Sequence, residues 1–361
     1  MKKYFIFITF LLILFFSYAF VRSKNPDNNI VAKNRIVSYL INNAKNDGTF
    51  TYLQTSRGQE DMSRNLYFRQ LYGMLAVASA LHANKSLELK KIHLRNIKSI
   101  TNHLRYENNF AYIHNSAEEN ILTETNIALL TLATSPESGK YKKDIEKLAN
   151  FILHQQRLDG YIFWTYPQKP ESAYDQKDFT VQSFTAGQSI LACAKAYELL
   201  KDEIYLTCAR MAFTYYYPLL NKKFDPTLTA WLIIGTTGLS IVDTQNEYKK
   251  ELHDLTMKLS SHVLDGQFFN QSKVLATNTS EIGLLVEALE KGMRHGSFSK
   301  SEYEKLKNIV TLGINSLLQN QVKSSNKKLD GGISTSSKDT SIQIDNTTHA
   351  YFALEEYTVT H

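Results

Sequence analysis

The sequence contains few of the residues that mark several specialised classes of protein. Among its 361 residues there are two cysteines, six prolines and two tryptophans. So few cysteines exclude a disulfide-stapled scaffold, and so few prolines exclude a proline-rich stalk. Hydrophobic residues make up 43% of the chain and charged residues 21%. These shares are typical of a globular protein, and they exclude a disordered chain and a multi-pass membrane protein.

The signature motifs of several enzyme classes are absent as well. No GxGxxG, GxxxxGK[ST], GxSxG or HExxH occurs, so nucleotide binding, serine hydrolysis and zinc proteolysis have no support. The ten histidines lack metal-ligand spacing, and no basic run is interleaved with aromatic residues. We therefore expect no metal ion, no cofactor and no nucleic-acid partner.

One long apolar run stands at the N-terminus. Tyr4–Val21 holds 18 uncharged residues, preceded by two lysines and followed by Arg22 and Lys24. Because a run of this length can span a bilayer, residues 1–24 are predicted to be a transmembrane anchor. A cleaved signal sequence is the alternative, with a weak cleavage pattern at Ser17–Ala19.

The early lysines favour an N-terminus in the cytoplasm. The richness in Asn, Lys and Ile is typical of a bacterial protein. We therefore expect an inner-membrane anchor with the globular part in the periplasm or outside the cell. The formal net charge of +6 belongs mostly to residues 1–24, because the remaining chain has 37 basic against 35 acidic residues. Net charge therefore gives no argument for an acidic partner.

Residues 25–361 form the second predicted unit, in which helix follows helix. Charged, amphipathic helices are predicted to begin near Val31, Leu87, Lys140, Glu203, Tyr248 and Ser301. Between them, helices rich in small and apolar residues are predicted over 69–81, 124–133, 185–200, 229–241, 277–289 and 346–357.

Turns rich in Asp, Asn and Gly follow most of the charged helices, and such residues suit tight reversals. These turns are Asp47-Gly48, Asn108-Asn109, Asp159-Gly160, Asp265-Gly266 and Asp330-Gly331, with a glycine-free segment at Asn221–Asp225 in the remaining unit. Six charged helices alternating with six apolar ones predict an all-α, alpha/alpha six-hairpin barrel, a closed toroid of two rings. An open, irregular helical solenoid is the alternative.

Two parts of the chain resemble a known superfamily. The first part is Gly187–Leu191, Ala196–Leu200 and Tyr205–Arg210, and the second is Gly331–Ile333, Ile342–Asp345 and Thr348–Ala350. Both are similar to the bacterial six-hairpin glycosidase-like superfamily, whose layout extends over most of residues 30–357. The resemblance implies an alpha/alpha barrel and carbohydrate chemistry. Because that superfamily includes hydrolases, lyases, epimerases and cyclase-like toroids, it supports the fold better than one activity.

Acid and base residues are expected where the apolar helices begin, because polar groups of such a barrel gather at one end. Glycoside hydrolysis needs two carboxyl groups, and Glu124, Glu281 and Asp345 lie at these positions. Capping of a helix N-terminus is the alternative role for each. His349 follows Asp345 by one helical turn on the same face, so it completes the predicted catalytic set.

A second set of residues is predicted to bind the substrate. It comprises Arg69, Gln70, Tyr72, Trp164, Tyr166, Gln188 and Trp231. Arg69, Tyr72 and His349 would also suit a lyase or an epimerase. The alternative for Arg69 is a buried ion pair between two inner helices, and the alternative for Trp164 and Tyr166 is to cover the barrel end.

Together these features predict a membrane-anchored, carbohydrate-active enzyme of the glycoside hydrolase, lyase or epimerase type. Its partner would be an envelope or extracellular polysaccharide or an oligosaccharide. The alternative is a barrel without catalysis that binds a glycan or a protein in an envelope complex. Cys193 and Cys208 each fall inside a predicted helix, where they form either two buried free thiols or a disulfide.

Overall fold

The computed structural model describes residues 26–55, 57–61, 66–114, 121–168, 176–265 and 278–361. The predicted anchor, residues 1–24, lies outside this part of the chain. No helix among the described residues is long and apolar enough to cross a membrane.

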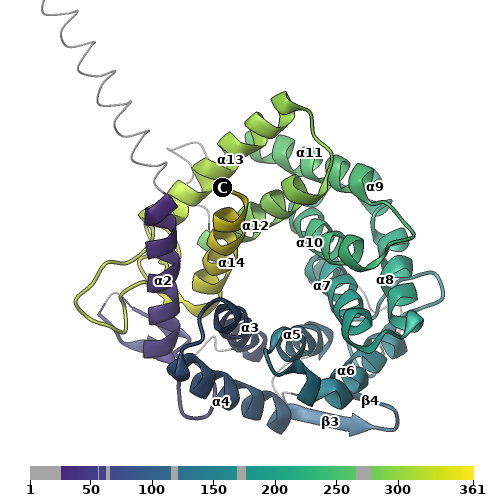
Figure 1. Cartoon of the computed structure of the whole chain (residues 1–361), viewed down its shortest axis with the longest axis horizontal. Coiled ribbons are helices and arrows are strands. Elements are labelled where there is room, and N and C mark those ends of the chain that lie inside the picture. The colour runs from purple at the N-terminus through teal and green to yellow at the C-terminus, as the bar shows by residue number, and fades with distance from the viewer. Residues whose placement is uncertain (1–25, 56, 62–65, 115–120, 169–175, 266–277) are drawn as a thin grey trace, which may run out of the picture.

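Amphipathic helices with charged outer faces form an outer ring (Figure 1). Their bounds are α2 (Pro26–Asn43), α4 (Leu87–His103), α6 (Lys142–Gln155), α8 (Glu203–Tyr216), α11 (Lys249–Asp265) and α13 (Lys300–Gln319). Each begins within two residues of its predicted start except α2, which begins five residues earlier. The sequence therefore predicts this layer closely.

Apolar helices form an inner ring inside the outer one (Figure 1). They are α3 (Tyr67–Ala83), α5 (Ile121–Thr134), α7 (Gln176–Leu200), α10 (Pro226–Val242), α12 (Thr279–His295) and α14 (Ile344–Thr360). Each contacts the next in chain order, and α14 returns to contact α3. This contact closes the ring, so the predicted alpha/alpha barrel is confirmed and the open solenoid is excluded.

The turns after the outer helices repeat one packing arrangement. Gly160 has a φ of 96° and Gly331 a φ of 86°, a backbone conformation that favours glycine. A Cβ atom on Gly160 would lie 2.1 Å from the carbonyl oxygen of Met211, and one on Gly331 would lie 2.1 Å from that of Arg35. Each turn therefore packs against the backbone of the next outer helix around the ring.

Longer connections run from each outer helix to the following inner helix. They contain the short strands β1 (Leu53–Gln54), β2 (Glu60–Asp61), β3 (Leu104–Glu107), β4 (Phe110–Ile113) and β5 (Ile342–Gln343). Strand β1 pairs antiparallel with both β2 and β5, and β3 pairs antiparallel with β4. In the glycine-free unit, the short helix α9 (Leu219–Lys222) replaces the turn, and Asp225 caps α10 by accepting a hydrogen bond from the Leu228 amide at 2.7 Å.

Small residues let the inner helices α7 and α10 approach closely. A Cβ atom on Gly187 would lie 2.1 Å from the carbonyl oxygen of Trp231, and one on Gly235 would lie 2.5 Å from that of Gly187. Between α7 and α8, Cys193 and Cys208 are buried free thiols whose sulfur atoms lie 2.6 Å apart. Of the two predicted alternatives, free thiols or a disulfide, the structure therefore has free thiols.

The substitution Gly187→Ala tests this contact. Its methyl group would meet a helix backbone that cannot rotate away, so we expect the free energy of unfolding to fall by about 1–3 kcal/mol. Urea denaturation measures the change. Gly139→Ala is the matched control, because no atom lies within 4 Å of its Cβ position, and an equal loss in both variants would contradict the account.

Candidate functional site

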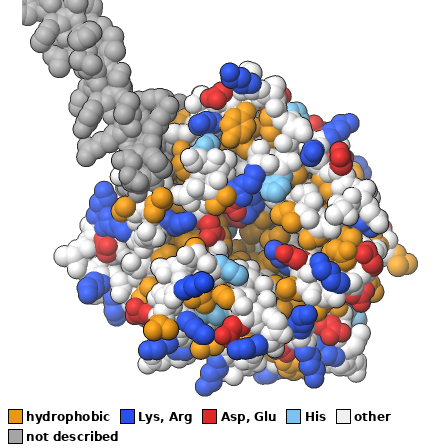
Figure 2. Space-filling view, viewed as in Figure 1, with side chains coloured by type: hydrophobic (Ala, Val, Ile, Leu, Met, Phe, Trp, Pro, Cys, Tyr) orange, Lys and Arg blue, Asp and Glu red, His pale blue; other side chains and the backbone are white. Residues whose placement is uncertain are grey.

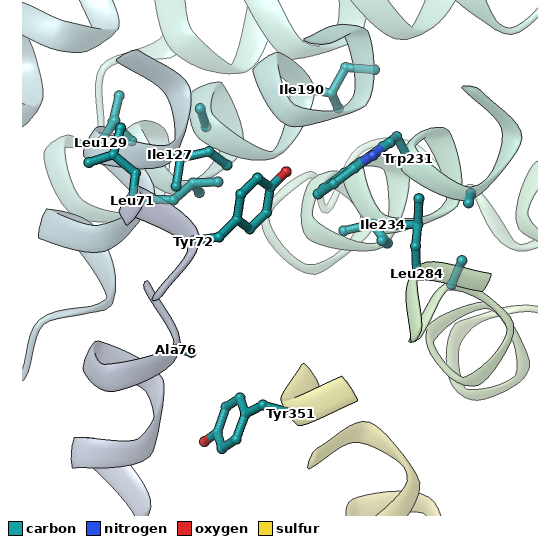
Figure 3. Close-up of a cluster of buried hydrophobic side chains, with 14 of the residues drawn as sticks. Leu71, Tyr72, Ala76, Ile127, Leu129, Ile190, Trp231, Ile234, Leu284 and Tyr351 are labelled. Atoms are coloured by element: carbon teal, nitrogen blue, oxygen red, sulfur yellow. The ribbon is translucent and has the colours of Figure 1, made fainter. Parts of the chain in front are cut away.

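Aromatic side chains from three inner helices meet inside the ring. The ring centroid of Tyr72 lies 5.1 Å from that of His349 and 6.2 Å from that of Trp231. Figure 3 shows Tyr72 and Trp231 pointing toward one another from opposite walls. The side-chain amide of Gln188 donates a hydrogen bond to the Tyr72 hydroxyl at 2.6 Å. The sequence analysis predicted these four residues separately, and the structure brings them together inside the ring.

An ion pair lies where these inner helices begin. The Arg69 Nε atom is 3.7 Å from the Asp345 Oδ2 atom, and the two side chains keep 24% and 16% of their surface exposed. The Arg69 guanidinium also donates a hydrogen bond to the Tyr52 hydroxyl. Burial raises the pKa of Asp345, and Arg69 opposes part of that rise. Arg69 therefore forms the ion pair between two inner helices that the sequence analysis gave as its alternative role. Both partners are partly exposed.

Four polar atoms of this site lack a hydrogen-bond partner within the described part of the chain. They are Arg69 Nε, Asp345 Oδ1, His349 Nδ1 and Gln188 Oε1. Buried polar groups in native proteins are normally satisfied, so such atoms indicate a place where solvent or a ligand binds. Burial also lowers the pKa of His349 to about 4, so its imidazole is neutral at neutral pH and can either donate or accept a hydrogen bond.

The other two predicted carboxylates lie at the starts of their helices. Glu124 is completely buried in the first turn of α5 and contributes to raising the pKa of Tyr67, a shift caused mainly by burial. Glu281 is partly buried in the first turn of α12, and burial raises its pKa. The cap of α12 is Asn278, which accepts a hydrogen bond from the Ser280 amide, so Glu281 is not the N-cap residue.

Three predicted substrate-binding residues hold loops in place instead of lining the interior with Tyr72. Gln70 accepts a hydrogen bond from the Phe50 amide at 2.7 Å. Tyr166 donates to Glu107 at 2.6 Å and packs edge-on against Phe110. Trp164 is buried, and its carbonyl oxygen accepts a hydrogen bond from the Leu122 amide. These contacts favour the covering role that the sequence analysis gave as the alternative for Trp164 and Tyr166.

The sequence analysis missed a second charged group inside the ring. Glu287 of α12 is 7% exposed, and its Oε1 atom lies 3.7 Å from the Lys291 Nζ atom. Lys291 also pairs with Glu356 of α14, whose other oxygen lies 2.7 Å from Arg294. Figure 2 shows a hollow at the centre of the ring, bordered by acidic and basic side chains.

Glu287 has the electrostatics of a proton donor at neutral pH. Burial raises its pKa to about 7, although Lys291 opposes the rise. After burial itself, Glu287 is the largest cause of the raised pKa of Tyr72, and Asp345 contributes in the same direction. Both carboxyl groups therefore raise the pKa of one hydroxyl.

This arrangement supplies two carboxyl groups in different environments, a neutral imidazole and a guanidinium beside an aromatic pair. Such groups can transfer protons to and from a bound molecule and can stack against an apolar ring face. Within the described residues, no group of three or more His, Cys, Asp or Glu side chains could hold a metal ion.

Comparison with solved structures places this geometry among known folds. The alpha-1,6-mannanase GH76A of Salegentibacter sp. HEL1_6 superposes with a TM-score of 0.65 at 12% identity, over 92% of this chain and all of that chain. The unsaturated glucuronyl hydrolase of Streptococcus agalactiae gives 0.64 at 13% identity, over 92% of each chain. The chain shares the six-hairpin alpha/alpha-barrel fold of these structures.

A third such structure, the unsaturated glucuronyl hydrolase of Bacillus sp. GL1, gives a TM-score of 0.63 at 12% identity, over 91% of this chain and 96% of that chain. No protein-family model matches the sequence, and no curated protein sequence is similar to it. At these identities the likeness establishes the six-hairpin fold alone, so the reaction has to be argued from this chain's own side chains.

The pH dependence of stability tests the environment of Glu287. The Glu287 carboxyl group binds a proton more tightly in the folded chain than in the unfolded chain. The protonated carboxyl group therefore contributes fully to the free energy of unfolding below about pH 4.5, and this contribution is lost as the pH rises through about 7. The loss is on the order of 3 kcal/mol. We expect the Glu287→Gln variant not to lose this stability, because glutamine does not ionise. Between about pH 4.5 and pH 7, the free energy of unfolding of the variant should therefore rise relative to that of the wild type.

Urea denaturation at a series of pH values measures that difference. Glu88→Gln, at an exposed carboxylate in the first turn of α4, is the matched control and should follow the wild type. A Glu287→Gln curve parallel to the wild-type curve would show that Glu287 ionises normally.

Proposed function

We propose that the protein is a carbohydrate-active enzyme whose substrate binds inside the ring, at the end where the inner helices begin. The observation that carries this proposal is Asp345, a partly exposed carboxyl group of raised pKa with one unpartnered oxygen, next to Arg69 and one turn from His349. Tyr72 and Trp231 offer ring faces to a pyranose in the same space.

The two carboxyl groups are suited to different roles in glycoside hydrolysis. Glu287, with a pKa near 7, retains a proton to give to the leaving oxygen, while Asp345 beside Arg69 is the base or nucleophile. His349 and Gln188 position the sugar through their unpartnered atoms. Glu281, which is only partly buried, remains a candidate for binding hydroxyl groups, whereas Glu124 is completely buried.

The fold neighbours suggest two classes of substrate. One solved mannanase structure is an inactive variant, with two consecutive aspartates replaced, in complex with alpha-1,6-mannotriose. This sequence contains no two consecutive aspartates, so it does not repeat that pair. The unsaturated glucuronyl hydrolases give the second class, and Arg69 supplies the cation that a uronate carboxylate would need. We therefore favour an acidic sugar.

We further propose that the Tyr4–Val21 run anchors the protein in a membrane, with the barrel on the outer side. The support is the length of the apolar run and the lysines before it.

Activity of the full-length protein tests the proposed enzyme. It would be incubated with unsaturated uronyl oligosaccharides and with alpha-1,6-linked mannan, and new reducing ends and the ultraviolet absorbance of the unsaturated uronate would be followed. We expect release of the uronate, and a fall in kcat of about 100-fold or more for Asp345→Asn, since the acid/base group is lost. Glu88→Gln should keep full activity.

Two outcomes would reject this assignment. Full activity in Asp345→Asn would remove Asp345 from the catalytic machinery. Saturable binding of an oligosaccharide without any turnover by the wild type would favour the non-catalytic, glycan-binding barrel. An increase in ultraviolet absorbance on an intact polyuronate would instead identify a lyase, with His349 as its base.

A further inference from the structure

One face of the barrel is formed by the starts of the outer helices and the ends of the inner helices, and we name it the anchor-side face. Hydrogen bonds between helix ends define it. The Lys33 ammonium near the start of α2 donates to the Thr358 hydroxyl near the end of α14 at 3.3 Å. Arg294 near the end of α12 donates to Thr360 at 3.0 Å. The Arg69–Asp345 ion pair lies at the opposite end of the same inner helices.

Exposed apolar side chains gather on the anchor-side face. Leu87 at the start of α4 is 77% exposed and Val359 at the end of α14 is 66% exposed. The full set there comprises Ile30, Val31, Leu87, Ile204, Ile241 and Val359. On the opposite face, the described residues place Tyr106, Leu158 and Leu264 of this kind. The segments 62–65, 115–120, 169–175 and 266–277, which join outer-helix ends to inner-helix starts, lie outside the described residues. The exposed apolar side chains of the anchor-side face are available for contact with lipid.

Charge does not distinguish this face. Acidic and basic residues alternate on it, as in the Lys140–Glu137 pair at 2.8 Å and the Lys90–Glu137 pair at 3.3 Å. Apolar side chains at helix ends therefore lie among charged ones on this face. Amphipathic surfaces of this composition bind at the boundary between lipid headgroups and acyl chains.

The segment between the apolar run and α2 is short, which limits how far this face can lie from a membrane. The apolar run ends at Val21, and α2 begins at Pro26 on the anchor-side face. Five residue steps span at most about 17 Å even when fully extended. A span that ends at Val21 therefore leaves the start of α2, with Ile30 and Val31, close to the bilayer surface.

We propose that the anchor-side face rests on the phospholipid bilayer, with Leu87, Ile204 and Val359 at the level of the headgroups. The end of the barrel that carries Arg69 and Asp345 then faces away from the membrane, toward a polymer in the surrounding solvent. This inference rests on the proposed anchor and is independent of the sugar chemistry, so activity assays cannot decide it.

Fluorescence quenching by lipid tests the orientation. The full chain would be reconstituted into vesicles of phosphatidylethanolamine and phosphatidylglycerol that contain a headgroup-level nitroxide lipid. A fluorophore would be attached to single cysteines introduced as Ile204→Cys, Val359→Cys and, on the opposite face, Leu158→Cys. The native thiols of Cys193 and Cys208 are buried, and labelling of the unsubstituted chain controls for them.

We expect the labels at positions 204 and 359 to lose fluorescence about twofold or more, and the label at 158 to keep it. Flotation of the unlabelled chain with the vesicles separates anchoring from docking. Weak quenching at all three positions in a chain that floats would overturn the docking, as would quenching at 158 alone. A chain that does not float would overturn both the anchor and the docking. A label at 204 shielded in a detergent-solubilised dimer but unquenched by lipid would assign this face to a second copy.

Discussion

The closure of the inner ring is the constraint on which the rest of the structure depends. Helix α14 must return to α3, so the intervening inner helices have to approach one another closely, and small residues such as Gly187 and Gly235 allow α7 and α10 to do so. A closed ring buries its inner helices on most sides, which explains why they are mainly apolar and why the charged side chains of α12 and α14 pair with one another. The outer helices then cover them, and their exposed faces carry the charge.

Closure also creates an interior in which polar groups are costly unless they face one another or a ligand. Charged side chains enter it from α3, α12 and α14, as Arg69, Glu287 and Asp345. Helix α7 contributes the amide of Gln188, and α10 contributes the ring of Trp231 (Figure 3). The interior therefore offers both hydrogen-bonding groups and aromatic faces. A sugar ring, with hydroxyl edges and an apolar face, can use both.

Sequence patterns predicted the helices well, because alternating charged and apolar helices with Asp-Gly turns follow from local chemistry. They also identified Arg69, Tyr72, Gln188, Trp231, Asp345 and His349, which lie near helix starts or inside apolar segments. Glu287 and Lys291 could not be recognised, because a Glu and a Lys four residues apart normally mark an exposed helix face. Only closure of the ring turns that face inward. Tyr166 could not be assigned either, since its partner Glu107 is 59 residues away in sequence.

The most direct test of the interior site is a crystal structure of the Asp345→Asn variant with an unsaturated uronyl disaccharide. The account predicts a sugar inside the ring, with its carboxylate on Arg69, its ring face against Trp231, and hydrogen bonds to the atoms of Gln188 and His349 that now lack partners. A sugar bound only on the outer helices, or an interior closed to it by Tyr72 and His349, would contradict the account.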